Sequence, residues 1–252
     1  MLTGWRHRLR IVEQTAVYRA SAPSVTVMLI LRPGHEQGAI ESLASAASSV
    51  YDELELFVLD VSGTHPPPAV RRFLDDHPSL PIALLRRHHD GGIADSRNVL
   101  AKRARGRYVL ALEPGASVYP STLQRLADAL DADPGAAFSY PMVGAYQAEE
   151  PVALLSSMPW EPERLRQGNW IDGIALIRRD RLLALGGYNN DPRLSGWEDF
   201  YLWCRFAAEG DHGVHVPQVL GSRRMTADQA TPEKWALMRE LFPTLLPAGA
   251  AG

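Results

Sequence analysis

Four short apolar segments recur along the first half of this sequence, and a segment with helical periodicity follows each of them. They span residues 25–31, 54–60, 80–85 and 107–112. Strands that are apolar at nearly every position are covered on both faces. Strands that alternate with helices at this rhythm form βαβ units. The sequence therefore predicts an α/β fold, a Rossmann-like three-layer sandwich around a mostly parallel sheet.

The second half carries a weaker pattern. Residues 137–143 form another apolar run, and its internal Pro141 predicts a place near an edge of the sheet. Residues 147–166 contain three prolines and little periodicity, which predicts a long loop. Residues 170–177 are again typical of a strand, and Thr231, followed by a proline, marks the start of a further helix.

The composition is that of one folded domain with short flanking segments. Of 252 residues, 46% are hydrophobic and 22% are charged, which is ordinary for a folded protein. We expect an N-terminal extension over residues 1–23, a single domain over 24–246 and a flexible tail over 247–252.

Charge and cysteine content narrow the partners and the compartment. The net charge of −3 gives no reason to expect nucleic-acid binding. The single cysteine, Cys204, excludes an internal disulfide and fits a reducing compartment, with its thiol in the core. No apolar run approaches the ~20 residues of a membrane span, so we expect a cytoplasmic protein without an integral membrane segment. Arg6, Arg8 and Arg10 offer a peripheral contact with an anionic membrane surface, although a solvated or packed extension explains them more simply.

Polar residues collect where the predicted parallel strands end. Ligands of such sheets bind beyond the carboxyl ends of the strands. Arg32, Asp60, the polar loop 86–92 and Glu113 all fall at these ends. This edge of the sheet is therefore the predicted binding site.

Two segments at this edge offer groups that suit a nucleotide. A carboxylate at the position of Asp60 accepts N–H hydrogens of a nucleobase. Residues 91–98, Gly-Gly-Ile-Ala-Asp-Ser-Arg-Asn, combine glycines that admit a ligand to the backbone, a helix start that binds anions, and Arg97. Each also has a structural explanation, because Asp60 can cap a turn and residues 95–98 can open a helix that carries a surface arginine.

A pair of carboxylates opens a helix further along the chain. Gly196-Trp-Glu-Asp199 precedes an aromatic-rich helical segment and follows Gly186-Gly-Tyr188. The helix dipole favours the anionic form of a carboxylate in the first turn. One such carboxylate within reach of a hydroxyl acts as a general base. The structural alternative is an acidic N-terminal cap.

The order of these segments along the chain resembles that of family 2 glycosyltransferases, which have the type A nucleotide-sugar-binding fold. The resemblance runs from about residue 25 to residue 224. It implies a nucleotide-binding half over 24–135 and an acceptor half over 136–246. It also implies two partners: a nucleotide-diphosphate sugar, and an acceptor that is a glycan, a lipid-linked sugar or a small molecule.

The resemblance implies a donor site with a weakened metal motif. In the family an Asp-x-Asp segment holds a divalent metal on the donor diphosphate, whereas this chain has Glu113-Pro-Gly115. Mg²⁺ and Mn²⁺ need oxygen ligands and Gly115 offers no side-chain oxygen, so Glu113 is a weak candidate ligand and a metal cofactor is doubtful. The basic pair Arg223-Arg224 would offset the missing positive charge of the metal by stabilising the leaving diphosphate. The implied donor contacts are Asp60, Arg97, Glu113 and, from the pair Arg223-Arg224, Arg224.

The resemblance further implies an inverting reaction with Asp199 as general base. Glu198 would orient the acceptor or its loop, and Gly196 and Trp197 would contact the acceptor, with the indole stacked on a sugar ring. Trp203, in the same helical segment, is expected in the core. The Gln-x-x-Arg-Trp motif and the membrane spans of the processive branch are missing from the sequence, which implies non-processive transfer.

Two other classes of protein are weighed against this one. A catalytically silent binding or assembly module with the same fold is favoured by Gly115 and by the unusual Arg32-Pro33 at the first strand end, and opposed by the intact Glu198-Asp199 pair. A nucleotidyltransferase of related fold lacks support, because no glycine-rich, lysine-containing loop follows the first strand.

Overall fold

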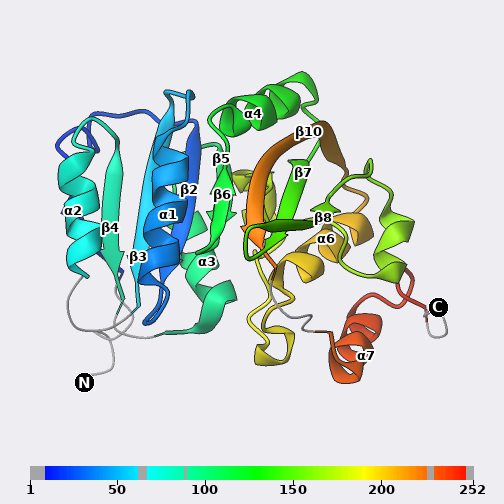
Figure 1. Ribbon diagram of the computed structural model, residues 1–252. Helices are drawn as coiled ribbons and strands as arrows, with labels where there is room; N and C mark the ends of the chain where they lie inside the picture. Colours follow the sequence, from blue (N-terminus) through cyan, green and yellow to red (C-terminus); the bar gives the residue numbers. More distant parts are fainter. Residues whose placement is uncertain (1–8, 62–66, 88–89, 226–229, 248–252) are drawn as a thin grey trace.

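The strands of the described residues form one sheet (Figure 1). The computed structural model describes residues 9–61, 67–87, 90–225 and 230–247. Within these residues, strands join in the order β1-β4-β3-β2-β5-β9-β7-β10-β6, and β8 pairs with β7. The strands are β1 (Arg10–Gln14), β2 (Val25–Leu31), β3 (Leu54–Asp60), β4 (Ile82–Arg86), β5 (Tyr108–Leu112), β6 (Ala116–Val118), β7 (Phe138–Gln147), β8 (Glu150–Leu155), β9 (Leu176–Arg178) and β10 (Gly213–Arg224).

Helices cover both faces of the sheet, and Figure 1 shows α1 lying over β2 and β3. One face carries α1 (Glu36–Ala47), α2 (Pro68–Asp76) and α4 (Thr122–Ala132). The other face carries α3 (Gly92–Arg103), α5 (Arg179–Ala184), α6 (Glu198–Ala208) and α7 (Pro232–Leu241). Two short 3₁₀ helices lie at Pro162–Gln167 and Pro192–Leu194.

Strand β2 shows how the sequence produces these layers. Val27 and Leu29 point into the core shared with α1, whereas Met28 points into the core shared with α3. Successive side chains of a strand alternate between faces, so a strand that is apolar throughout supplies both cores. β2 pairs in parallel with β3 and β5, and β3 pairs in parallel with β4. The predicted three-layer α/β fold with a mostly parallel sheet is confirmed.

The predicted N-terminal extension contributes a strand to the sheet. β1 pairs antiparallel with β4 and forms the outer strand on that side. Thr15 anchors the end of β1, because its hydroxyl donates to the Leu80 carbonyl (2.5 Å) and accepts from the Ile82 N–H (3.0 Å). The predicted anionic-surface contact falls partly on residues 6 and 8, which lie outside the described residues; Arg10 is exposed.

The placement of Pro141 near a sheet edge was wrong. Its strand β7 lies between β9 and β10. A proline is tolerated there because the pairing changes around it: β9 pairs with Phe138 and Ser139, and β8 pairs only from Val143 onward. On the β10 side the register shifts beyond the pair Pro141–Val216. The missing N–H therefore falls at irregularities of the ladder.

Residues 147–166 were wrongly expected to form a loop. They contain β8, which forms a hairpin with β7, and most of a 3₁₀ helix. The strand was missed because its residues are exposed and lack alternation. The strand expected over 170–177 is confined to β9 at its end. The tail beyond residue 247 lies outside the described residues.

Several local expectations are confirmed. Thr231 caps α7 by accepting from the Lys234 N–H (3.3 Å), and Cys204 and Trp203 are fully buried. None of the helices in the described ranges has the length and apolar character needed to cross a membrane.

Candidate active site

Three carboxylates and two arginines form a continuous series of ion pairs, which we call the ion-pair chain. Its order is Asp172, Arg223, Glu113, Arg97, Asp199. Arg223 donates to Asp172 Oδ2 (2.6 Å) and approaches Glu113 Oε2 (3.4 Å). Arg97 donates to Glu113 Oε1 (2.9 Å) and to Asp199 Oδ1 (2.8 Å). Each guanidinium therefore bridges two carboxylates, and Glu113 joins the two halves.

The ion-pair chain gathers residues that are far apart in the sequence. Arg97 lies on α3, Glu113 directly follows β5, and Asp199 lies in the first turn of α6. Asp172 precedes β9, and Arg223 lies near the end of β10. The parallel strand β5 ends at this position, so the cluster lies at the edge of the sheet that the sequence predicted.

Arg97 is held by packing as well as by charge. Its side chain is only 3% exposed, and its guanidinium lies 5.1 Å from the centre of the Tyr188 ring. Burial by itself would lower the pKa of Arg97, but the charges of Asp199 and its neighbours raise that pKa above the usual value. A fully charged arginine is therefore built into the interior at this point.

Asn98 ties the helix of Arg97 to the Gly-Gly-Tyr segment. Its side-chain oxygen accepts from the Tyr188 N–H and its amide donates to the Tyr188 carbonyl, both at 2.8 Å. Gly187 has φ +83°, and a Cβ there would lie 2.1 Å from the Asn98 oxygen. Only glycine fits that position. The Arg-Asn pair and the Gly-Gly-Tyr segment, which look separate in the sequence, form one packing unit.

The carboxyl group of Asp199 has a raised pKa. Its side chain is 19% exposed. Burial raises the pKa of Asp199 to about 6; Arg97 lowers it in part, and Glu113 and Glu198 raise it further. At neutral pH the carboxylate is ionised but is more basic than an ordinary aspartate. Gly173 packs against it, since a Cβ at that glycine would lie 2.8 Å from Asp199 Oδ2.

The residues around Asp199 form a tight turn. Gly196 has φ +84°, and its N–H donates to Glu198 Oε2 (2.8 Å). Glu198 is 7% exposed and Trp197 is 8% exposed. The Trp197 ring makes edge contacts with Phe200 (5.1 Å) and Trp235 (5.2 Å). The acceptor contacts predicted for Gly196 and Trp197 stay predictions, and the indole would have to leave this packing to stack on a sugar.

Asp60 lies at the end of β3 and is fully buried. Its Oδ2 accepts from Arg86 Nη2 (3.2 Å) and Nε (3.3 Å). Residues 62–66, which follow this strand closely, and residues 88–89 of the polar loop 86–92 lie outside the described residues. The predicted contact between Asp60 and a nucleobase therefore stays a prediction.

A hollow of about 350 Å³ lies beside Glu113. The first residues of α1, the turn after β5 and the end of β10 line it. Arg223 and Arg224 both face this space, but Arg224 is 70% exposed and lies 3.6 Å from Glu41, whereas Arg223 is 22% exposed. The structure thus brings Arg223, and not the predicted Arg224, into the ion-pair chain.

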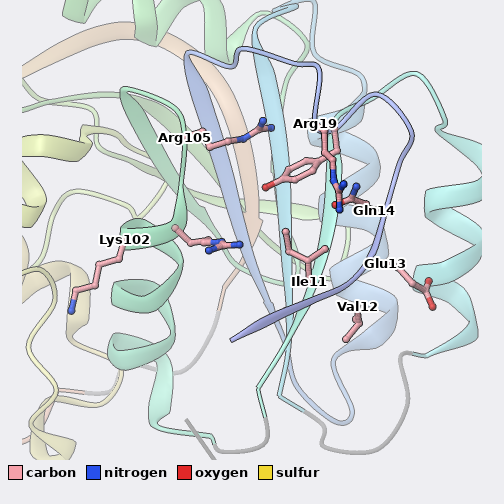
Figure 2. A pocket seen from close by; sticks show the side chains of 9 residues that line it. Ile11, Val12, Glu13, Gln14, Arg19, Lys102 and Arg105 are labelled. Atoms are coloured by element: carbon pink, nitrogen blue, oxygen red, sulfur yellow. The ribbon is translucent and has the colours of Figure 1, made fainter. Parts of the chain in front are cut away.

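A larger hollow of about 890 Å³ lies at the far end of α3 (Figure 2). Strand β1 and the segment after it line one side, with Ile11 and Arg19, and the last turn of α3 and Arg105 line the other. α3 carries Arg97 of the ion-pair chain in its middle, and its last turn lines this second hollow. The predicted site residues line none of this second hollow.

The groups around Glu113 do not fit a divalent metal. Within the described ranges, no three or more His, Cys, Asp or Glu side chains are placed to hold one. The two oxygens of Glu113 already face guanidinium groups. Gly115 has φ +87°, a backbone conformation that favours glycine, so the turn itself disfavours the second acidic residue of the family motif.

The family model for glycosyl transferase family 2 matches residues 35–178, more than half of the chain. The chain belongs to this family. The match spans Arg97 and Glu113 and ends before α6, so Asp199 lies beyond it.

Relatives carry names of the same kind. "Putative glycosyltransferase EpsE" of Bacillus subtilis is 25% identical over 82% of this chain and 75% of its own length. An "Uncharacterized glycosyltransferase" of Haemophilus influenzae is 24% identical over 71% of this chain and 60% of its own length.

Solved structures share the fold. The 1–349 fragment of S. aureus TarS in complex with UDP-GlcNAc superposes with a TM-score of 0.68 at 14% identity, over 86% of this chain and 65% of the fragment. The mannosyltransferase PcManGT of Pyrobaculum calidifontis, in complex with GDP-Man and Mn²⁺, gives 0.61 at 22% identity, over 88% of this chain and 62% of its own. This chain therefore spans less than two thirds of either neighbour.

Proposed function

We propose that this chain is an inverting, non-processive glycosyltransferase that moves a sugar from a nucleotide-diphosphate donor to an acceptor hydroxyl. The observation that carries the proposal is Asp199, a partly exposed carboxylate at the start of α6 with a pKa of about 6. A group of that pKa is largely ionised at neutral pH and still accepts a proton well. Membership of glycosyl transferase family 2 supports the reaction class.

The proposed reaction uses Asp199 as general base. The acceptor oxygen bonds to the anomeric carbon while its proton passes to the carboxylate. The bond between that carbon and the diphosphate oxygen breaks, and its electron pair leaves with the nucleoside diphosphate. Arg97 holds Asp199 Oδ1 (2.8 Å), so the other oxygen, Oδ2, is the one we assign to the proton. Attack opposite the leaving group inverts the anomeric centre.

The donor is proposed to bind along the carboxyl ends of the strands. The base would lie near Asp60, and Arg97 and Glu113 would border the ribose and phosphates. UDP-GlcNAc in TarS and GDP-Man in PcManGT support a nucleotide sugar as donor. For the acceptor we propose a hydroxyl of a glycan, a lipid-linked sugar or a small molecule, oriented by the turn around Glu198.

The proposal is tested by replacing Asp199 with Asn. We expect Asp199→Asn to abolish sugar transfer while nucleoside diphosphate binding, measured by calorimetry, remains. Asp128→Asn, an exposed aspartate on α4, is the matched control and should transfer normally. Unchanged turnover in the Asp199 variant would show that the base lies elsewhere.

A silent binding module is the second candidate. It is favoured by the occupied oxygens of Glu113, which already face Arg97 and Arg223. Calorimetry of the unmodified protein with UDP and with GDP tests whether the chain binds a nucleotide, and a silent module that still binds one differs from the enzyme in giving no sugar transfer. Failure of both nucleotides to bind, with and without Mn²⁺, would favour the silent module.

A further inference from the structure

We propose that Arg223, positioned by Asp172, neutralises the donor diphosphate in place of a divalent metal, so that nucleotide binding by this chain does not depend on metal. The inference rests on the proposed function, since it needs a diphosphate at this site. It differs from that function in naming the group that binds the diphosphate and a residue, Asp172, that positions it.

The groups around Glu113 suit an arginine better than a metal. A metal bound at Glu113 would displace guanidinium contacts from both carboxylate oxygens. It would gain no second ligand from the turn, because position 115 is a glycine with φ +87°. Arginine is the side chain that binds phosphate groups through two parallel N–H donors.

Asp172 is built to hold this arginine. Its side chain is 2% exposed, and its Oδ2 accepts from Arg223 Nη1 at 2.6 Å. The other oxygen accepts from the Ile174 N–H (2.9 Å), and the Asp172 N–H donates to the Ser156 hydroxyl (2.8 Å). With both oxygens bound, this carboxylate cannot move without breaking buried hydrogen bonds.

The other end of Arg223 is looser and faces the hollow. Its contact with Glu113 is 3.4 Å long, against 2.6 Å to Asp172, and the side chain retains 22% exposure. Arg223 pairs with Ala116 across β10 and β6, which brings it beside the turn that starts at Glu113. A phosphate oxygen in the hollow can replace the weak Glu113 contact while Asp172 keeps its own.

The hollow suits an anion in a second way. Four residues around the start of the twelve-residue helix α1 also line it: Gly34, His35, Gln37 and Gly38. The N–H groups and dipole of a helix start favour a phosphate. Arg223, held by Asp172, thus supplies a fixed cation, and the start of α1 supplies backbone N–H donors. Together they can stabilise the negative charge that develops on the leaving diphosphate.

The first experiment measures UDP and GDP binding by calorimetry in EDTA and in Mn²⁺. We expect the dissociation constant of the better nucleotide to change by less than about threefold between the two conditions, because the cation belongs to the protein. Binding that requires Mn²⁺ would overturn this inference and leave the proposed function intact. No binding in either condition would overturn the proposed function itself.

The second experiment separates Arg223 from Asp172. In EDTA, Arg223→Gln should weaken nucleotide binding by roughly tenfold or more, and Arg223→Lys, which keeps the charge but not the two parallel donors, should lie between. Asp172→Asn should raise the donor KM with a smaller change in kcat, and Asp172→Glu should recover part of the loss. A purely structural Asp172 would instead lower kcat and the melting temperature and leave KM unchanged.

Arg125→Gln, on the exposed side of α4, is the matched control and should bind as the unmodified protein does. Circular dichroism of each variant checks that it is folded. Equal affinity of the folded Arg223→Gln variant and the unmodified protein in EDTA would refute the assignment.

Discussion

The two arginines of the ion-pair chain have the same carboxylate between them but different surroundings. Arg97 is 3% exposed, has two carboxylates within 2.9 Å and lies over the Tyr188 ring. Arg223 is 22% exposed and has one close carboxylate, Asp172. The first is fixed on every side, whereas the second keeps one face toward a hollow.

The difference divides the site into two parts. We call Arg97 with Asp199 the rigid part and Arg223 with Asp172 the exchangeable part. An arginine buried between two carboxylates and an aromatic ring fixes the geometry of its partners. Arg97 therefore acts on Asp199, whereas Arg223 remains available to an anion. The resemblance between sequences assigns Arg97 and Arg224 to the donor, whereas the contacts bring Arg97 and Arg223 into the ion-pair chain.

The largest expected effect comes from removing the arginine of the rigid part. Arg97→Gln leaves Asp199 and Glu113 without their shared cation, and breaking a buried pair costs about 3–5 kcal/mol. Arg223→Gln removes one close charged hydrogen bond, the one to Asp172, and should cost less, about 1.5–3 kcal/mol. Urea unfolding of both variants measures the two values. Equal losses in the free energy of unfolding would show that the two arginines do not differ in how firmly they are held.

Gly173→Ala tests the rigid part without changing a charge. The added methyl would lie 2.8 Å from Asp199 Oδ2 and must displace that carboxylate. A misplacement of about 1 Å costs on the order of 100-fold in rate, so we expect kcat to fall by that order. Gly135→Ala is the matched control, because its new methyl has no described neighbour nearer than 3.5 Å outside its own chain neighbours. Similar turnover in both variants would contradict the packing argument.

The exchangeable part was also the harder one to predict from the sequence. Arg97, Asn98 and the carboxylate pair of α6 stand in local patterns with glycines and a helix start, and the structure brings them together. Asp172 lies inside an apolar segment that the sequence predicts to be a strand, and the sequence gives no partner for its carboxylate. The adjacent Gly173 was the available signal, since an Asp-Gly pair is unusual within a buried strand.

The choice between Arg223 and Arg224 illustrates a second limit. In a regular strand, counting residues decides which of two neighbours faces the site. β10 changes register with β7 twice, between Val216 and Val219 and between Val219 and Gly221. Each irregularity alters the count, and the sequence does not reveal it. The layers of the fold, by contrast, follow from apolar segments that need no exact register.

The pH dependence of transfer probes the ionisation of Asp199. Because its pKa is raised to about 6 and the base must be ionised, kcat/KM should fall about tenfold per pH unit below 6 and level off above it. Stability should respond in the opposite sense. A folded-state pKa above the unfolded value of 3.8 favours the protonated folded form, so this contribution is complete below pH ~4 and is lost as the pH rises through 6.

Rate profiles and urea unfolding from pH 4.5 to 8 measure both trends on the same protein. Arg223→Lys serves as the matched variant, since it changes the exchangeable part and keeps a cation beside Glu113. The kcat/KM of this variant should still rise with pH near pH 6, even if its KM for the donor is higher. If the pH at which kcat/KM rises changed with this substitution, the two parts of the ion-pair chain would titrate as one unit. The division into a rigid and an exchangeable part would then be wrong.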